Sequence, residues 1–549
     1  MPTVNLNKKE VLKLLERKIS DEELKEKIPM LGTDLEEITK DEIKVEIFPN
    51  RPDLLSEQGL ARALSSFLEI KTGLKQYTIN KSDYQVIIKD SVSKVRPYTA
   101  CAVIKNLKLN DEKIKQIIQI QEKLHTTYCR NRKKAAIGIY PLENIKLPIT
   151  YEARKPKDIL FQPLDFPGKM TGEQIVTRHK IGKEYGHLLK DKPLYPIFID
   201  SNNEILSLPP IINSENTGRI TEKTKDVFIE FSGFDFEVLS LGLNMIVTAL
   251  ADMGGEIYEM NLIYPDKKLK TPNLEPSKYK IDLNYINKIL GLVLKENEVK
   301  ILLEKMGYDY KNKQVLVPAY RADIMHQIDF VEDIAIAYGY YNFKEEIPKV
   351  ATIAKENKLE IFKNKIADIL IGLNLLEVHT YNIVSEDDQN KKMNCNLELV
   401  KLSNALSSEY NVLRSWITPS LIRILEENKH HEYPQNLFGF GRIFQKDNST
   451  ETKVKEYERL SIILCEKDSN FTKIKQILEE LTYALDLKYT LEKIKHPSLI
   501  EGRTARIKIN NKKIGYIGEV HPLVLNNFKI ELPVSIIELN LSEILNNDL

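Results

Sequence analysis

Acidic side chains recur at helical spacing within residues 320–340. Asp329, Glu332 and Asp333 stand at i, i+3 and i+4, so a helix would place their carboxylates on one side. Carboxylates at that spacing repel one another by about 1 kcal/mol per pair at about 4 Å in water. A cation would relieve this repulsion, and oxygen ligands without histidine or cysteine favour a hard ion such as Mg²⁺. The alternative is a helix whose acidic face is solvated.

The helix that positions these acids is predicted from its apolar spacing and from its ends. Asp323 precedes the helix, where an aspartate satisfies the free N–H groups of the first turn, and Gly339 is suited to ending it. The expected apolar face consists of Ile324, Ile328, Val331, Ala335 and Tyr338.

Length and composition limit what the rest of the chain can be. The 549 residues exceed one hydrophobic core, and about three to four domains are expected. The 80 basic and 79 acidic residues balance, which excludes a strongly basic body that wraps nucleic acid. The four cysteines form no C-x-x-C pair, so no zinc site is expected. Neither a glycine-rich phosphate loop nor a run of about 18 apolar residues occurs, so we expect a cytoplasmic protein without a membrane span.

Proline-rich and polar stretches divide the chain into four expected domains. Residues 1–83 are predicted to form a small α+β domain, and residues 84–265 a longer mixed domain. Residues 272–343 form a compact segment that contains the acidic stretch. Helical and β-rich stretches alternate in residues 355–549. The expected fold class is therefore α+β and multidomain.

Several motifs, in the same order along the chain, resemble those of phenylalanyl-tRNA synthetase β subunits of the archaeal and eukaryotic type. The acidic stretch resembles that family's signature R-x-D-I-x-x-x-x-D-[hydrophobic]-x-E-[DE]. The N-R-P-D-L element at residues 50–54 resembles the family's N-terminal motif. The other matching segments are residues 130–140, 205–214, 402–415 and 514–522. The resemblance spans nearly the whole chain.

This resemblance implies a role for each domain. Residues 84–265 resemble the tRNA-editing domain (B3/B4 type), and residues 272–343 a small, helix-containing, B5-type metal-binding domain. Residues 355–549 resemble a catalytic-like class II synthetase module with an antiparallel sheet. The implied Mg²⁺ ligands, at the contact with the α subunit, are Asp323, Asp329, Glu332 and Asp333. The implied assembly is an α₂β₂ heterotetramer in which the α subunit binds ATP and phenylalanine and this chain contributes to binding tRNA(Phe).

An editing site fits the chemistry of the implied substrate. Phenylalanine and tyrosine differ by one hydroxyl, which an apolar pocket rejects only about a hundredfold, so a second, hydrolytic site is needed for mischarged Tyr-tRNA. By the resemblance, the candidate pocket residues are Leu206, Ser214, Asn216, Thr217 and Asp235. Turn or cap chemistry is the alternative for each polar one. No nucleophilic histidine or cysteine arrangement accompanies them, so water positioned by the RNA's own terminal hydroxyl and a side-chain base both stay open.

A short basic run is the candidate RNA contact. It comprises Arg130, Arg132, Lys133 and Lys134, and its alternative is a solvated loop. Two other functions are considered: a free-standing tRNA-editing hydrolase, and an RNA-binding scaffold with an inactive editing site. Phe234, which stands where the family pattern suggests threonine, leaves the second of these open.

The C-terminal module is not expected to activate an amino acid. Class II synthetases carry a G-x-G-x-x-R element whose arginine lies near the adenine of ATP. The corresponding stretch here starts at Gly439 and has Phe444 in place of that arginine. Arg442 is expected to support a strand. We therefore expect the module to be non-catalytic, with activation left to the α subunit.

Overall fold

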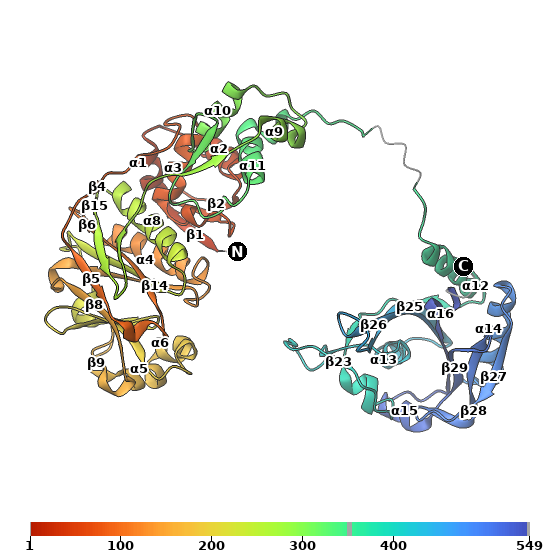
Figure 1. The fold of residues 1–549 in the computed structure, drawn as a ribbon. Helices are drawn as coiled ribbons and strands as arrows, with labels where there is room; N and C mark the ends of the chain where they lie inside the picture. The colour runs from red at the N-terminus through yellow and green to blue at the C-terminus, as the bar shows by residue number, and fades with distance from the viewer. Residues whose placement is uncertain (1, 349–353, 546–549) are drawn as a thin grey trace. The chain divides into compact units, whose positions relative to one another are not determined.

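The chain divides into two units, Met1–Ile347 and Pro348–Leu549 (Figure 1). The computed structural model describes residues 2–348 and 354–545. Both units combine helices with largely antiparallel sheets, so the predicted multidomain α+β fold class is confirmed.

The first unit begins with an antiparallel sheet in the order β1-β3-β2 that packs with three helices. In β3, Ile43 and Val45 are buried while their neighbours are not, as expected for a strand with one face on the core. Ser56 caps α3 by accepting from the Gly59 N–H. The elements are β1 (Thr3–Asn7), α1 (Lys8–Leu15), α2 (Asp21–Met30), β2 (Asp34–Ile38), β3 (Glu42–Glu46) and α3 (Glu57–Phe67).

Two sheets form the middle of the first unit. The five-stranded sheet has the order β4-β15-β6-β14-β7, and the seven-stranded sheet the order β13-β12-β11-β8-β5-β16-β17. The strands of the first are β4 (Ile79–Asn80), β15 (Glu256–Tyr258), β6 (Tyr98–Lys105), β14 (Val227–Gly233) and β7 (Ala135–Pro141). Those of the second are β13 (Ile212–Asn213), β12 (Ile205–Leu208), β11 (Tyr195–Ile199), β8 (Ile149–Arg154), β5 (Gln85–Ile88), β16 (Met260–Ile263) and β17 (Lys268–Thr271).

Side chains from both sheets form one apolar cluster, in which Tyr140 and Phe228 of the first sheet join Tyr151, Phe198 and Leu206 of the second. The two sheets therefore pack face to face. Helices α4 (Asp111–Thr126) and α8 (Phe236–Asp252) pack on the five-stranded sheet. The remaining elements of this part are the short helices α5 (Gly172–Arg178), α6 (Lys180–Tyr185) and α7 (Glu215–Gly218), and the strands β9 (Leu160–Phe161) and β10 (Met170–Thr171).

The acidic stretch lies in the third part of the first unit, which has a sheet of order β18-β20-β19. Helix α11 (Gln327–Tyr338) carries the acids and ends at Gly339, as predicted. The predicted cap is wrong: His326 is the N-cap, and the Asp329 carboxylate accepts from the His326 N–H. The other elements are β18 (Ser277–Lys280), α9 (Leu283–Leu290), α10 (Glu296–Lys305), β19 (Asp309–Lys311) and β20 (Gln314–Val317).

The predicted apolar face of α11 is also partly wrong. Ile328 is 40 % exposed, whereas Phe330 and Ile334 are buried. Asp333 lies on the buried side because Arg321 supplies a compensating charge at 2.8 Å. The buried Arg321, which precedes the helix, therefore changed which face of the helix packs.

One cavity of about 400 Å³ is lined by the buried pair Arg51–Asp53 and by Arg321, from a distant part of the chain. The Arg51 guanidinium donates two hydrogen bonds of 2.9 Å to Asp53 in the N-R-P-D-L element. Arg321 donates to Asp323 at 2.8 and 2.7 Å, and also to Asp333. The N-terminal motif and the acidic stretch are thus structural neighbours.

The second unit is built on a seven-stranded sheet of order β21-β25-β26-β30-β29-β28-β27. Its strands are β21 (Leu376–Glu377), β25 (Gln435–Lys446), β26 (Val454–Cys465), β30 (Val534–Asn540), β29 (Lys512–Val520), β28 (Leu499–Ile509) and β27 (Tyr489–Lys493). The helices are α12 (Lys358–Gly372), α13 (Thr418–Asn428), α14 (Phe471–Ala484), α15 (Pro522–Asn527) and α16 (Leu541–Leu545). A small sheet adds β22 (Ile383–Val384), β24 (Val412–Leu413) and β23 (Val400–Lys401).

Candidate functional site

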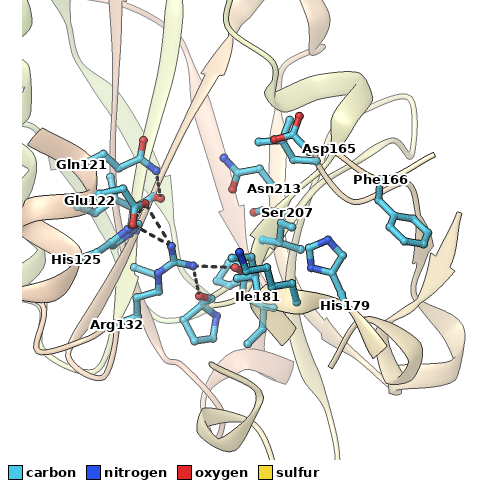
Figure 2. A pocket seen from close by; sticks show the side chains of 18 of the residues that line it. Gln121, Glu122, His125, Arg132, Asp165, Phe166, His179, Ile181, Ser207 and Asn213 are labelled. Atoms are coloured by element: carbon cyan, nitrogen blue, oxygen red, sulfur yellow. Dashed lines mark hydrogen bonds and ion pairs between the residues drawn. The ribbon is translucent and has the colours of Figure 1, made fainter. Parts of the chain in front are cut away.

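A cavity of about 670 Å³ opens between the two middle sheets of the first unit (Figure 2). Residues of β7 and β14 form one wall, and residues of β12 and β13 with the preceding prolines form another. Helix α4 and the corner between α5 and α6 complete it. The cavity is large enough for an aminoacyl group and part of a nucleoside.

Four buried polar atoms around this cavity have no hydrogen-bond partner among the residues that the structure describes. Among residues 2–348 and 354–545, twelve buried side-chain nitrogen or oxygen atoms lack a partner. Four of the twelve belong to residues that line this one cavity: Arg132 Nε, His179 Nδ1, Ser207 Oγ and Glu230 Oε2. An unpaired buried polar group costs about 1–3 kcal/mol, so their concentration indicates a polar ligand.

Glu230 is the buried acid of the cavity. Its Oε1 accepts a hydrogen bond of 3.2 Å from the Tyr140 hydroxyl, while its Oε2 has no partner. Burial raises the pKa of Glu230 to about 8, although the charge of Arg96 and the hydrogen bond from Tyr140 oppose that rise. The carboxyl is therefore mainly protonated near neutral pH, and it can both donate and accept.

A glycine provides the space for the Tyr140–Glu230 pair. A Cβ at Gly138, in β7, would lie 2.1 Å from the Tyr140 hydroxyl oxygen and 2.7 Å from Glu230 Oε1. Any side chain at this position would displace the pair.

The two histidines of the cavity have different environments. Both ring nitrogens of His125 have hydrogen-bond partners: Nε2 accepts from the Ile137 N–H at 2.9 Å, and Nδ1 lies 3.1 Å from the Glu122 carboxylate. Burial lowers the pKa of His125, so a neutral ring fits both contacts. His179 is different, because its buried Nδ1 has no partner, and burial lowers its pKa as well. Sequence reasoning missed both histidines because they share no motif spacing.

The predicted editing residues lie next to the cavity and do not line it. Leu206 is in the apolar cluster between the sheets, and the residue that follows it, Ser207, reaches the cavity. Ser214 is buried at the start of α7, and the Thr217 hydroxyl donates to the Ile205 carbonyl. Asn216 is exposed.

Asp235, the fifth editing candidate, has a cap role. Its carboxylate accepts from the Glu237 and Val238 N–H groups at the start of α8. The neighbouring Phe234 is 50 % exposed, and the Arg96 guanidinium lies 5.3 Å from its ring centre. Neither Asp235 nor Phe234 lines the cavity, so Phe234 does not change the cavity wall directly.

The basic run is divided between two environments. Arg130, Lys133 and Lys134 are exposed, as a phosphate contact requires. Arg132 is turned toward the cavity and donates from Nη1 to the Pro210 and Ile211 carbonyls at 3.2 and 2.8 Å. It is therefore not available to RNA in the way predicted for the run.

The four predicted Mg²⁺ ligands are not assembled into one group by this chain. Asp323 and Asp333 both pair with Arg321. The Asp329 carboxylate accepts from the Met325 and His326 N–H groups at the start of α11, and Glu332 is exposed. Within the described ranges, no group of three or more acidic, histidine or cysteine side chains is placed to hold a metal ion. These residues alone do not fit the ion, so no chemical step is assigned to it.

In the second unit, a buried arginine lies beside the glycine-containing stretch that starts at Gly439, and its hydrogen bonds go to the protein itself. Arg414 donates to the Arg442 and Thr380 carbonyls, the Thr380 hydroxyl and the Asn382 side chain. A Cβ at Gly441 would lie 1.9 Å from Arg414 Nη2, so the guanidinium fills the space beside this glycine. Arg442 itself is exposed and pairs with Glu456 at 2.9 Å.

Comparison with known proteins places the chain in a family. Three family models match: "Phe-tRNA synthetase beta subunit B1 domain" at residues 1–70, "tRNA synthetase B5 domain" at 279–340, and "Phenylalanyl tRNA synthetase beta chain CLM domain" at 344–541. The phenylalanine–tRNA ligase beta subunit of Pyrococcus abyssi is 40 % identical over 98 % of this chain and 99 % of its own length. The chain belongs to the family of phenylalanine–tRNA ligase beta subunits.

Other relatives agree with this assignment. The beta subunit of Archaeoglobus fulgidus is 38 % identical over 94 % of this chain and 94 % of its own length. A solved N-terminal fragment of the phenylalanyl-tRNA synthetase beta subunit from Pyrococcus horikoshii matches with a TM-score of 0.60 and 40 % identity. It covers 62 % of this chain and 100 % of that fragment.

The beta-subunit interpretation is supported over the free-standing hydrolase, because the relatives match both units and one family model lies almost entirely in the second unit. No helix in the part of the chain that the structure describes has the length and apolarity needed to cross a membrane.

Proposed function

We propose that this chain is the non-catalytic β subunit of an α₂β₂ phenylalanine–tRNA ligase and that it binds tRNA(Phe). The α subunit would bind ATP and phenylalanine, and Mg²⁺ would assist there as it does in phosphoryl and nucleotidyl chemistry generally. The self-paired Arg414 and the absence of an arginine at Phe444 support this division of labour.

We further propose that the cavity of the first unit hydrolyses Tyr-tRNA(Phe). The observation that carries this proposal is the set of four unpartnered buried polar atoms around one cavity, since such atoms persist where a ligand satisfies them. The candidate pocket thus moves from the five residues suggested by sequence to Ser207, Glu230 and their neighbours.

The protonated Glu230 would recognise the phenol. Its Oε2 exchanges a hydrogen bond with the tyrosine hydroxyl, while Tyr140 holds Oε1. A phenylalanyl group would leave Oε2 buried and unpaired, at a cost of about 1–3 kcal/mol, or about 5- to 150-fold in binding. Discrimination by a hydroxyl therefore favours the noncognate group here, the reverse of what the ligase site requires.

Hydrolysis needs a positioned water and donors for the developing oxyanion. Water attacks the ester carbonyl, the tetrahedral oxyanion collapses, and the terminal ribose oxygen leaves with a proton. Ser207 and His179 lie on the cavity wall as polar groups that can orient this water or the ribose, and His179 is neutral near pH 7.

Two assays test these proposals separately. Phenylalanine-dependent ATP–pyrophosphate exchange should be absent for the purified chain and present after addition of the catalytic partner; exchange by the chain alone would refute the β-subunit role. The complex should deacylate preformed Tyr-tRNA(Phe) faster than Phe-tRNA(Phe), and equal slow rates for both would refute editing.

A further inference from the structure

Arg132 is held in the cavity wall by an unusual backbone. Arg130, Asn131 and Arg132 have successive φ angles of 50°, 52° and 62°, all in the left-handed region. Such a conformation costs about 1–2 kcal/mol for each residue other than glycine. Three in a row persist only where other contacts fix them, and such strain is concentrated at functional sites. The turn is closed by backbone bonds, including one from the Arg132 N–H to the His125 carbonyl.

The Arg132 side chain joins two walls of the cavity (Figure 2). On one side, Nη1 donates to the Pro210 and Ile211 carbonyls, between β12 and β13. On the other, Nη2 lies 3.3 Å from the Glu122 carboxylate of α4. The guanidinium also lies 4.4 Å from the ring centre of Tyr185 in α6. One planar group thus contacts three elements that no strand pairing connects to one another.

Glu122 extends this link to the strand beneath the cavity. Burial alone would raise the pKa of Glu122, but the hydrogen bond from His125 and the charge of Arg132 lower it. His125 in turn accepts from the Ile137 N–H in β7, next to the glycine that makes room for the Tyr140–Glu230 pair. The chain of contacts runs from the β12–β13 wall, through Arg132, to the strand that carries Tyr140.

We propose that Arg132 is a positioning residue of the editing site, which fixes the β12–β13 wall that carries Ser207 relative to the strands that carry Tyr140 and Glu230. This inference rests on the proposed editing function. The requirement is for the planar fork of the guanidinium, because Lys provides a single point donor and cannot bridge two carbonyls and a carboxylate at once.

The test uses the full complex with its catalytic partner and preformed Tyr-tRNA(Phe). Arg132→Ala should lower deacylation at least tenfold, because two wall carbonyls and one carboxylate lose their partner. Added guanidinium chloride, at concentrations well below those that unfold the complex, should restore part of the rate, and Arg132→Lys should stay impaired. Arg154→Ala, which removes a partly exposed arginine of β8 paired with Glu152, is the matched control and should keep the wild-type rate.

The outcomes separate this proposal from the one on which it depends. If the wild-type complex does not deacylate Tyr-tRNA(Phe), the editing function itself is refuted. If it does, wild-type rates in Arg132→Ala or full recovery in Arg132→Lys would overturn the positioning role. Loss that guanidinium does not restore, in a variant that retains phenylalanine-dependent exchange, would overturn it as well.

Discussion

The pH dependence of editing should depend on Glu230. Burial holds the pKa of this carboxyl at about 8 instead of about 4.5, which at 1.36 kcal/mol per pH unit corresponds to about 5 kcal/mol against the charged form. A bound tyrosyl group excludes more water and penalises the charge further. The protonated form should therefore be the one that binds, and editing should weaken as the pH rises through about 8.

The magnitude follows from the titration. The protonated fraction of Glu230 falls from about one half at pH 8 to about one tenth at pH 9, so kcat/KM for Tyr-tRNA(Phe) should fall about fivefold between these pH values. Glu230→Gln keeps a donor and an acceptor in the same shape, so its profile should be flat over this range. Glu230→Ala should lose about 5- to 150-fold below about pH 8, where the wild-type carboxyl is protonated.

The assay is deacylation of preformed Tyr-tRNA(Phe) by the complex from pH 6.5 to about 9, with the uncatalysed ester hydrolysis subtracted at each pH. A wild-type profile that stays level above pH 8, or a Gln variant that falls as steeply as the wild type, would refute the role given to the protonated carboxyl.

Three further substitutions test other parts of the structure. Gly138→Ala places a methyl group against the Tyr140 hydroxyl, so Tyr-tRNA deacylation should fall while phenylalanine-dependent exchange is kept; intact deacylation would contradict the packing argument. Arg321→Met removes the cation that pairs with the partly buried Asp323 and the buried Asp333, and should lower the free energy of unfolding by about 3–5 kcal/mol in denaturant titrations, where an unchanged midpoint would count against the network. The Asp329→Ala Glu332→Ala variant should weaken assembly with the catalytic partner in analytical ultracentrifugation, and assembly equal to wild type would exclude these carboxylates from the contact with the α subunit.

The sequence predicted helix α11 and its end at Gly339 because apolar spacing and glycine are local signals. It did not predict the cap or the buried position of Asp333. Asp323, the predicted cap, and Asp333 both pair with the Arg321 guanidinium. These tertiary contacts are not encoded in the local sequence pattern. The same reason explains the basic run, where the strained turn directs Arg132 inward and leaves Arg130 exposed.

The proposed editing cavity lies beside the residues that the resemblance suggested. Ser207 follows the predicted Leu206, and Asn213 precedes the predicted Ser214. In a strand, successive side chains point to opposite faces, so Leu206 lies in the apolar cluster while Ser207 lines the cavity. Glu230 was missed because a glutamate in an apolar strand has no local signature until its neighbours are known.

The two neighbouring Arg-x-Asp pairs restrict how this family can be recombined. Arg51–Asp53 and Arg321–Asp323 come from segments at opposite ends of the first unit, yet Arg51, Asp53 and Arg321 are buried around one cavity. A chimera that takes the N-terminal segment from one relative and the remainder from another combines one ion pair from each parent, and the two pairs did not evolve together. Crossover points that keep both pairs from a single parent should therefore give folded hybrids more often than those that separate them.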